Sequence, residues 1–268
     1  MLPRHVSFRL LSLIICLVLC CGARAAVPPA ALADWSHLDD AAVIEQAKRL
    51  GAEGLLARLA EGANRLPEYE LWMARQERLD TGWNEQPFLQ FIKYRHSPRQ
   101  VYMSWLPGGP KAGQEILFDE TRRPDAMYGH LSGMFNMVSM WTRLDGALAR
   151  SNSLHSIRDV GLQSVVDILK AQQAERRHAG VSVEPDEIRI ERIQGERVLA
   201  VSWPAAPGLA GAYAARTRLC LDLRHPWVRQ VESWDERGQL KERVLYQRVE
   251  PAHFTARDFD PQNPDYRF

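Results

Sequence analysis

The sequence predicts an α+β protein in which a strongly curved antiparallel sheet, a half-barrel, cups helices on its concave side. Short runs rich in aromatic and aliphatic residues, separated by turns that contain glycine and proline, are typical of antiparallel strands joined by hairpins. These runs lie on both sides of a central segment whose apolar residues have helical spacing. A strand, helix, strand order of this kind favours one sheet with helices packed on one face.

Residues 1–25 have the features of a cleaved export signal. Arg4 and Arg9 provide a positive start, the apolar run Leu10–Cys21 follows, and Ala23-Arg24-Ala25 has the small-x-small pattern that signal peptidase prefers. The run is shorter than the roughly 20 residues needed to span a bilayer, which argues against a membrane anchor. We therefore expect a mature periplasmic protein with no integral membrane segment after cleavage.

The cysteines are consistent with this prediction. Attachment of lipid at Cys20 or Cys21 is an alternative to simple cleavage, but the residues before them are not the small ones normally required there. Cleavage leaves Cys220 as the single cysteine of the mature chain, which can form no internal disulfide. Its strand-like surroundings indicate a small packed side chain.

Residues 26–66 are expected to form an N-terminal helical segment. Ser36 and Asp39 are good N-caps, and apolar residues recur at helical spacing after them. Gly51 and Gly54 interrupt this pattern, which predicts two helical pieces rather than one continuous rod.

Residues 67–268 are expected to form the sheet domain, with a tail from Phe254 that lies over its surface. Strict alternation puts Val101, Met103 and Trp105 on one face of a strand. The expected strands are Leu71–Leu79, Phe88–Arg95, Val101–Leu106, Glu115–Asp119, Glu187–Ile193, Val198–Trp203, Ala215–Leu223, Val228–Trp234 and Leu240–Val249.

Residues 126–178 are expected to form a helical insert in this domain. Apolar residues recur at spacings of four and three in Ala126–Trp141, and Ile157–Ala174 has a firmer helical pattern. Four of the chain's seven methionines fall in the first of these segments. Because methionine is flexible and polarizable, the segment is either a helix packed into the core or a mobile lid over an apolar ligand.

Composition and motifs exclude several classes of function. The chain has 34 basic and 33 acidic residues, unlike the strong basic excess of nucleic-acid binders. No nucleophile elbow, phosphate-binding loop, zinc-protease motif or dinucleotide fingerprint is present in the sequence. We therefore expect no catalytic residue, no metal site, no cofactor and no nucleic-acid partner.

Five blocks of sequence are distinctive when taken together. They are Arg75–Leu79 (RQERL), Phe91–Pro98 (FIKYRHSP), Val101–Leu106 (VYMSWL), Leu240–Gln247 (LKERVLYQ) and Asp258–Phe268 (DFDPQNPDYRF). From about residue 69 to its end, the chain resembles the DUF1571 family of exported bacterial proteins. That family has no characterised function, so the resemblance implies no activity.

The strand order also resembles the LolA-like fold of periplasmic lipoprotein carriers, LolA and LolB, and of related envelope-stress sensors. In that fold a curved antiparallel sheet wraps helices and encloses an apolar cavity for acyl chains. The resemblance implies that residues 67–268 are a LolA-like domain, which is a statement about fold rather than function.

Our leading hypothesis is a non-enzymatic periplasmic binder or carrier of an apolar ligand, either a lipid or the acyl chain of a lipoprotein. A bent sheet with an apolar inner face needs something to fill its concave side. The residues expected to contact the ligand are Phe91, Met103, Trp105, Leu221 and Val231 on strands, and Met134 and Met137 on the lid. Face assignment from alternation can slip by one residue.

Two other hypotheses remain open at this point. The first is an envelope interaction or sensor protein that binds a protein partner through the same concave face or through the tail. The second is an enzyme whose site has no recognisable motif, around Tyr69, Arg95 and His96.

Overall fold

The computed structural model describes residues 33–133, 138–150, 153–204 and 213–268. The expected signal peptide lies outside these ranges, so its cleavage stays a prediction. The residues in these ranges include twelve strands, which form one sheet. Their bounds are β1 Glu68–Leu79, β2 Gly82–Trp83, β3 Phe88–Arg95, β4 Gln100–Trp105, β5 Glu115–Asp119, β6 Ala126–His130, β7 Met140–Arg143, β8 Glu187–Ile193, β9 Glu196–Trp203, β10 Arg216–Asp222, β11 Val228–Trp234 and β12 Leu240–Pro251.

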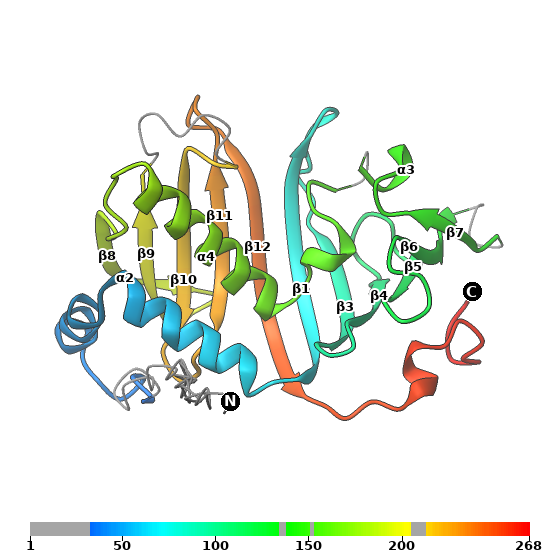
Figure 1. Cartoon of the computed structure of the whole chain (residues 1–268), viewed down its shortest axis with the longest axis horizontal. Coiled ribbons are helices and arrows are strands. Elements are labelled where there is room, and N and C mark those ends of the chain that lie inside the picture. Colours follow the sequence, from blue (N-terminus) through cyan, green and yellow to red (C-terminus); the bar gives the residue numbers. More distant parts are fainter. Residues whose placement is uncertain (1–32, 134–137, 151–152, 205–212) are drawn as a thin grey trace, which may run out of the picture.

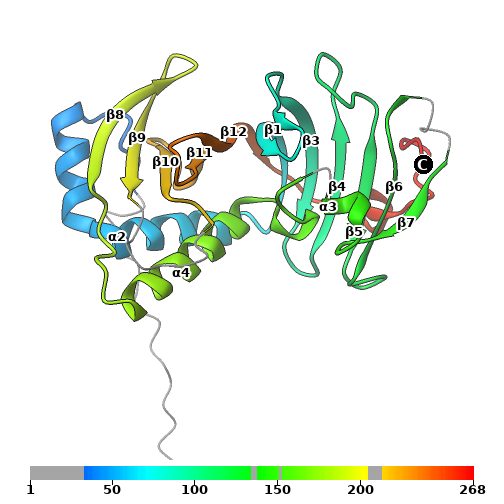
Figure 2. The ribbon, with the colours of Figure 1, turned by 90° about the horizontal axis from the view of Figure 1, so that it is seen from above.

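The sheet is antiparallel throughout and does not close. Its strand order is β7-β6-β5-β4-β3-β1-β12-β11-β10-β9-β8, and the short β2 pairs with β1 outside this path. The two longest strands, β1 and β12, pair at the centre (Figure 1). Figure 2 shows the sheet bending, with the helices on one side of it. The predicted fold class, an α+β protein with a curved antiparallel sheet, is confirmed.

Burial alternates along the central strands as the period of two predicts. In β1, buried residues alternate with half-buried ones from Tyr69 to Glu77, and in β3 from Phe88 to Tyr94. We call the face that carries Leu71 the inner face and the opposite one the outer face. The inner face is the one against which the helices pack.

Helix α2, Asp40–Asn64, has two pieces, as the glycines predicted. It begins after Asp39, whose carboxylate accepts a hydrogen bond of 2.8 Å from the Ala42 amide. Gly51 breaks the helix, with a φ of 61°. After the break, Oε2 of Glu184 accepts a hydrogen bond of 2.9 Å from the Ala52 amide. The second piece therefore starts with a side-chain cap from a distant segment.

The inner face is covered over β9–β12 by the second piece of α2 and by α4, Leu162–His178 (Figure 1). The buried residues Val165, Val166 and Leu169 of α4 join the same apolar core as the inner residues of these strands. No helix in the described ranges is long and apolar enough to cross a membrane.

The prediction of a helical insert is wrong for the first part of that segment. Residues 126–130 and 140–143 form strands β6 and β7. In the described part of residues 138–178, the helical elements are α3 (Ala147–Arg150), the 3-10 turn Ile157–Asp159 and α4. At Gly129, a Cβ atom would lie 2.4 Å from the Glu115 carbonyl oxygen, so the backbone of β6 sits tightly on β5. Glycine weakens a helix, and the backbone groups along the edge of β5 need partners, which a strand can supply and a helix cannot.

The C-terminal tail lies over the surface of the sheet domain, as expected, and it crosses the outer face. It contains the 3-10 turn Ala256–Phe259, whose Asp258 pairs with Lys93 at 2.7 Å. The Tyr266 ring stacks on Tyr102 of β4 with centroids 3.8 Å apart and an angle of 7° between the rings. The tail therefore covers the back of the strands that form the candidate site.

Candidate ligand-binding site

Two neighbouring cavities lie on the inner face of the sheet. Cavity A has a volume of about 410 Å³ and lies between β4–β7 and residues 153–161, which we call the crossing segment. Cavity B has a volume of about 290 Å³ and lies between β1, β10–β12 and α4. Because Arg75, His155 and Val160 line both cavities, the two are adjacent and the crossing segment runs between them.

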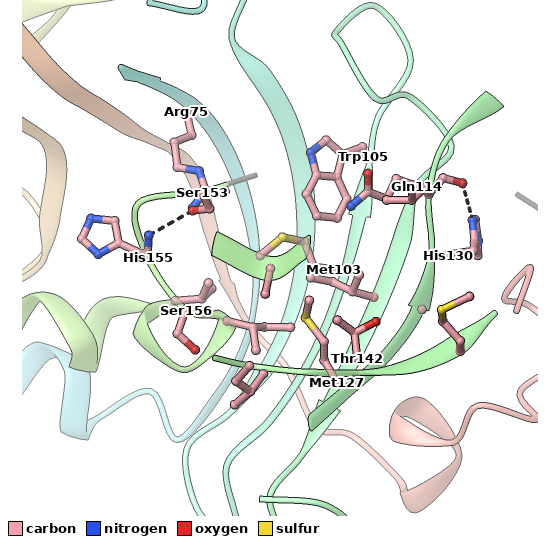
Figure 3. A pocket seen from close by; sticks show the side chains of 18 of the residues that line it. Arg75, Met103, Trp105, Gln114, Met127, His130, Thr142, Ser153, His155 and Ser156 are labelled. Carbon is pink, nitrogen blue, oxygen red and sulfur yellow. Dashed lines mark hydrogen bonds between the residues drawn. The ribbon is translucent and has the colours of Figure 1, made fainter. Parts of the chain in front are cut away.

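Cavity A has mostly apolar walls. The inner residues of the strands form one wall, and the crossing segment supplies the opposite one (Figure 3). Its larger apolar residues are Met103, Trp105, Ile116, Met127, Leu131, Val138, Met140, Leu144, Leu154, Ile157 and Val160. Its volume is within the range of about 300–1,000 Å³ usual for small-molecule sites, and such sites combine apolar walls with a few polar groups.

The exposed apolar side chains gather at these cavities. Val138 is 60% exposed, Met140 52% and Ile168 38%, and these are the only large hydrophobic residues exposed in the described part of the chain. Val138 and Met140 line cavity A, and Ile168 lines cavity B. A single exposed apolar residue is ordinary, but exposed residues confined to cavity rims indicate a binding surface.

Two buried carboxylates hold the crossing segment to the sheet. Glu77 of β1 accepts hydrogen bonds of 3.0 Å from the Ser153 hydroxyl and from the Leu154 amide. Glu242 of β12 lies 3.0 Å from Nε2 of His155. Both carboxylates are on the inner face and less than 5% exposed, so they fix the segment that separates the cavities.

Glu242 and His155 form a buried ion pair. Burial opposes the charge of each group, but the hydrogen bond and charge of the partner outweigh it, so the pKa of Glu242 is lowered and that of His155 is raised. The Tyr213 hydroxyl donates to Glu242 at 3.1 Å. Burial, and then the Glu242 charge, raise the pKa of Tyr213, which keeps it a donor.

Three of the residues expected to contact a ligand line these cavities. Met103 and Trp105 lie in cavity A and Val231 lies in cavity B. Met134 and Met137, which were expected on a lid, are outside the described residues. Contact with a ligand stays a prediction for all five.

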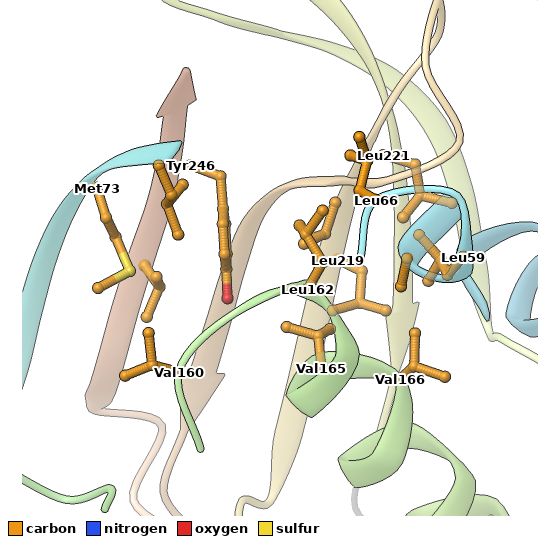
Figure 4. Close-up of a cluster of buried hydrophobic side chains, with 14 of the residues drawn as sticks. Leu59, Leu66, Met73, Val160, Leu162, Val165, Val166, Leu219, Leu221 and Tyr246 are labelled. Atoms are coloured by element: carbon orange, nitrogen blue, oxygen red, sulfur yellow. The ribbon is translucent and has the colours of Figure 1, made fainter. Parts of the chain in front are cut away.

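The other two residues do not line either cavity. Phe91 is on the outer face, where its ring lies 5.0 Å from that of Trp72, because Gln90 and Ile92 take the inner positions of β3. Leu221 is on the inner face but is buried in the core that α2 covers (Figure 4). The alternation of β3 was assigned one residue out of phase.

Sequence reasoning missed the polar groups of the site. Arg75 and Glu77 continue the inner phase of Leu71 and Met73, and Glu242 is in phase with the inner residues of β12. Charged residues in the apolar phase of an alternating strand are unusual, since buried charges are rare unless paired. That break in the pattern was the available signal.

Arg95 lies on the other face of the sheet from Tyr69, so the three residues of the candidate enzyme site are not brought together. Nδ1 of His96 is 3.3 Å from the hydroxyl of Tyr94, whose ring stacks on Tyr69. Tyr69 is on the inner face, where its hydroxyl accepts the Leu162 amide at 2.7 Å. Arg95 is on the outer face and pairs with Glu68 at 2.7 Å. In the described ranges, no three His, Cys, Asp or Glu residues are grouped so that they could hold a metal ion.

Solved structures similar to this chain have low sequence identity to it. An uncharacterized conserved protein from Thermus thermophilus is 12% identical over 79% of this chain and 95% of its own, with a TM-score of 0.43. The MucA/MucB complex of Pseudomonas aeruginosa is 17% identical over 78% of this chain and 60% of that one, with a TM-score of 0.41. A LolA superfamily protein from Nitrosomonas europaea is 12% identical over 78% and 97%, with a TM-score of 0.34.

The family is shown by a direct match. No curated protein sequence matches the chain. A family model described as a protein of unknown function, DUF1571, matches residues 66–268. These residues include the five blocks and every strand of the sheet, and the chain therefore belongs to the DUF1571 family.

Proposed function

We propose that the protein is a non-enzymatic periplasmic binder or carrier of an apolar ligand, a lipid or the acyl chain of a lipoprotein. The observation that supports this best is the pair of adjacent apolar cavities with exposed Val138, Met140 and Ile168 at their rims. The periplasmic location rests on the export signal expected in residues 1–25.

The energetics favour an acyl chain in such a site. Each methylene removed from water contributes about 0.8 kcal/mol. Burial of a chain of about a dozen methylenes would therefore contribute roughly 10 kcal/mol to the free energy of binding. That exceeds the entropic cost of association when this cost is at the lower end of its range, about 4 kcal/mol. The rim side chains would leave water in the same event, which adds to the gain.

The direct test is native mass spectrometry with lipid extraction on protein purified from its own periplasm. A lipid or acylated peptide bound at near one-to-one stoichiometry is the expected result, and it would identify the ligand class. A ligand-free mass, together with no uptake of a fluorescent fatty acid, would contradict the proposal.

Charged residues at the rims are expected to weaken binding without unfolding the protein. In Met140→Glu and Ile168→Glu, the new carboxylate must lose water beside the ligand, so affinity for a fluorescent fatty acid should fall about 10-fold or more. Both positions are exposed, so the free energy of unfolding should change by less than about 0.5 kcal/mol. Lys170→Gln is the matched control: it makes the same charge change at an exposed position of α4 that lines neither cavity. If Met140→Glu and Ile168→Glu bound the fatty acid as tightly as Lys170→Gln, the proposed binding site would be contradicted.

A protein partner is the alternative, and one observation favours it. Strand β7 is at an edge of the sheet and carries the exposed Met140 beside cavity A. An edge strand can pair with an added strand whose side chains enter neighbouring pockets. An envelope protein captured from extracts by the native protein and lost with Met140→Glu, in a protein that takes up no lipid, would support this alternative.

A further inference from the structure

Arg75 places a buried positive charge where the two cavities meet. Its side chain leaves the inner face of β1 and lines both cavities, and only 7% of the residue is exposed. Its Nε atom lies 3.5 Å from Glu77 Oε2, and neither of these atoms has a hydrogen-bond partner among the described residues. A guanidinium has several N–H donors, and a buried charge with unused donors is costly, so a further partner is expected.

Glu77 lies between Arg75 and the crossing segment, and only its Oε2 approaches the guanidinium, on the Nε side. Its other oxygen, Oε1, accepts the hydrogen bonds from Ser153 and Leu154. The geometry therefore leaves the guanidinium of Arg75 facing the cavities (Figure 3).

A second donor without a partner belongs to Trp105, which lines cavity A. The indole Nε1 of Trp105 is buried and has no hydrogen-bond partner within the described part of the chain. Trp105 pairs with Gln90 on β3, and Gln90 pairs with Met73 on β1, one inner position away from Arg75. Both residues line cavity A from the inner face of the sheet, on strands that β3 separates.

The surroundings of Arg75 favour an anionic partner. The carboxylate of Glu242 is already paired with His155, and Oε1 of Glu77 already accepts two hydrogen bonds from the crossing segment. The walls of the cavities are mostly apolar, and an ionic hydrogen bond is strong in such a site.

We propose that Arg75 and Trp105 form a subsite for a carboxylate or phosphate group, so that the ligand is an anionic amphiphile. Its oxyanion would accept hydrogen bonds from the guanidinium and the indole N–H, and its chain or chains would lie in cavities A and B. This inference rests on the proposed function, because it assigns the polar end of the same ligand.

The test compares ligands that share one chain and differ only in the polar end. Calorimetry would measure binding of dodecanoate, dodecyl phosphate and 1-dodecanol to the purified protein stripped of lipid. At least one anion should bind roughly 10- to 100-fold more tightly than the alcohol, as expected for a hydrogen-bonded charge. Which anion shows the preference tells a carboxylate ligand from a phosphate one.

Variants assign the preference to the subsite. In Arg75→Met, the affinity for the anion should fall to that for the alcohol, and the affinity for the alcohol should change by less than about twofold. In Trp105→Phe, the ratio of the two affinities should fall several-fold. Arg248→Met is the matched control, because it removes the same charge from an exposed outer position of β12. Arg75→Lys keeps the charge but loses the planar fork, and it replaces Arg75→Met if that variant does not fold.

The outcomes separate this inference from the proposed function. An alcohol bound as tightly as both anions by the native protein, or a preference that survives Arg75→Met, would overturn the subsite while the apolar site stands. Failure of all three ligands to bind the folded protein would overturn both.

Discussion

Replacing Gly161 by alanine is expected to lower the free energy of unfolding by about 4 kcal/mol. Gly161 joins the crossing segment to α4 with φ 102° and ψ 172°, a region that is essentially restricted to glycine. A Cβ atom there would lie 2.5 Å from the Tyr69 hydroxyl and 2.8 Å from the Tyr94 ring. These two rings are buried and stacked with centroids 4.9 Å apart, so neither can move aside cheaply.

The loss would be measured by urea unfolding, with Gly180→Ala as the control. Gly180 follows the other end of α4 with φ +67°, and a Cβ atom there would have nothing within 4 Å. That substitution carries the backbone strain alone and should cost about 1 kcal/mol. Equal losses in the two variants would show that the contact with Tyr69 and Tyr94 does not restrict this position.

The substitution Glu242→Gln is expected to cost about 3 kcal/mol near pH 6. It removes one partner of a buried ion pair and leaves the charged His155 in a largely apolar surrounding, with its side chain 19% exposed. Breaking such a pair is costly because the remaining charge stays buried without compensation. Since Glu242 and Glu77 together hold the crossing segment, binding in both cavities should weaken as well.

The cost of Glu242→Gln should depend on pH with a definite sign. The pKa of His155 is raised above 6.5, so its contribution is complete below about pH 6.5 and is lost as the pH rises through the folded pKa. The pKa of Glu242 is lowered below 4.5, so its contribution is complete above about pH 4.5 and is lost as the pH falls through the folded pKa. The difference between native protein and variant should therefore be largest between these values and smaller at about pH 9.

Unfolding by urea at several pH values checks this prediction. Glu250→Gln is the control: it is an exposed carboxylate of the same strand, paired with Arg248 at 2.6 Å. It should change the free energy of unfolding by less than about 1 kcal/mol. A cost for Glu242→Gln that is the same at pH 6 and pH 9 would mean that the pair with His155 does not supply the stability.

Local sequence was sufficient for most of the strands. The expected strands Phe88–Arg95, Glu115–Asp119, Glu187–Ile193 and Val228–Trp234 have the same bounds in the structure. Turn residues end each strand and alternation keeps it extended, and both signals act between near neighbours in the chain. The break of α2 at Gly51 was predictable for the same reason, since it depends on one residue's backbone freedom.

Local sequence failed where a distant segment decided the conformation. The spacing of apolar residues in 126–141 favoured a helix. In the structure, β6 instead pairs with the edge of β5, and β7 pairs with β6. For Phe91, the choice between two faces depended on the register with β1 and β4, and alternation alone leaves both faces possible.

The sequence by itself determined the curved antiparallel sheet, the broken N-terminal helix and the family, because patterns along a continuous chain are enough for each. Only the tertiary structure decided the candidate site. Glu77 and Glu242 come from opposite ends of the sheet domain and meet as partners in the β1–β12 ladder, where the crossing segment binds both. A cluster of this kind depends on contacts between residues far apart in the chain. Charges in the apolar phase of a strand mark such residues as unusual, but they do not show which of them meet.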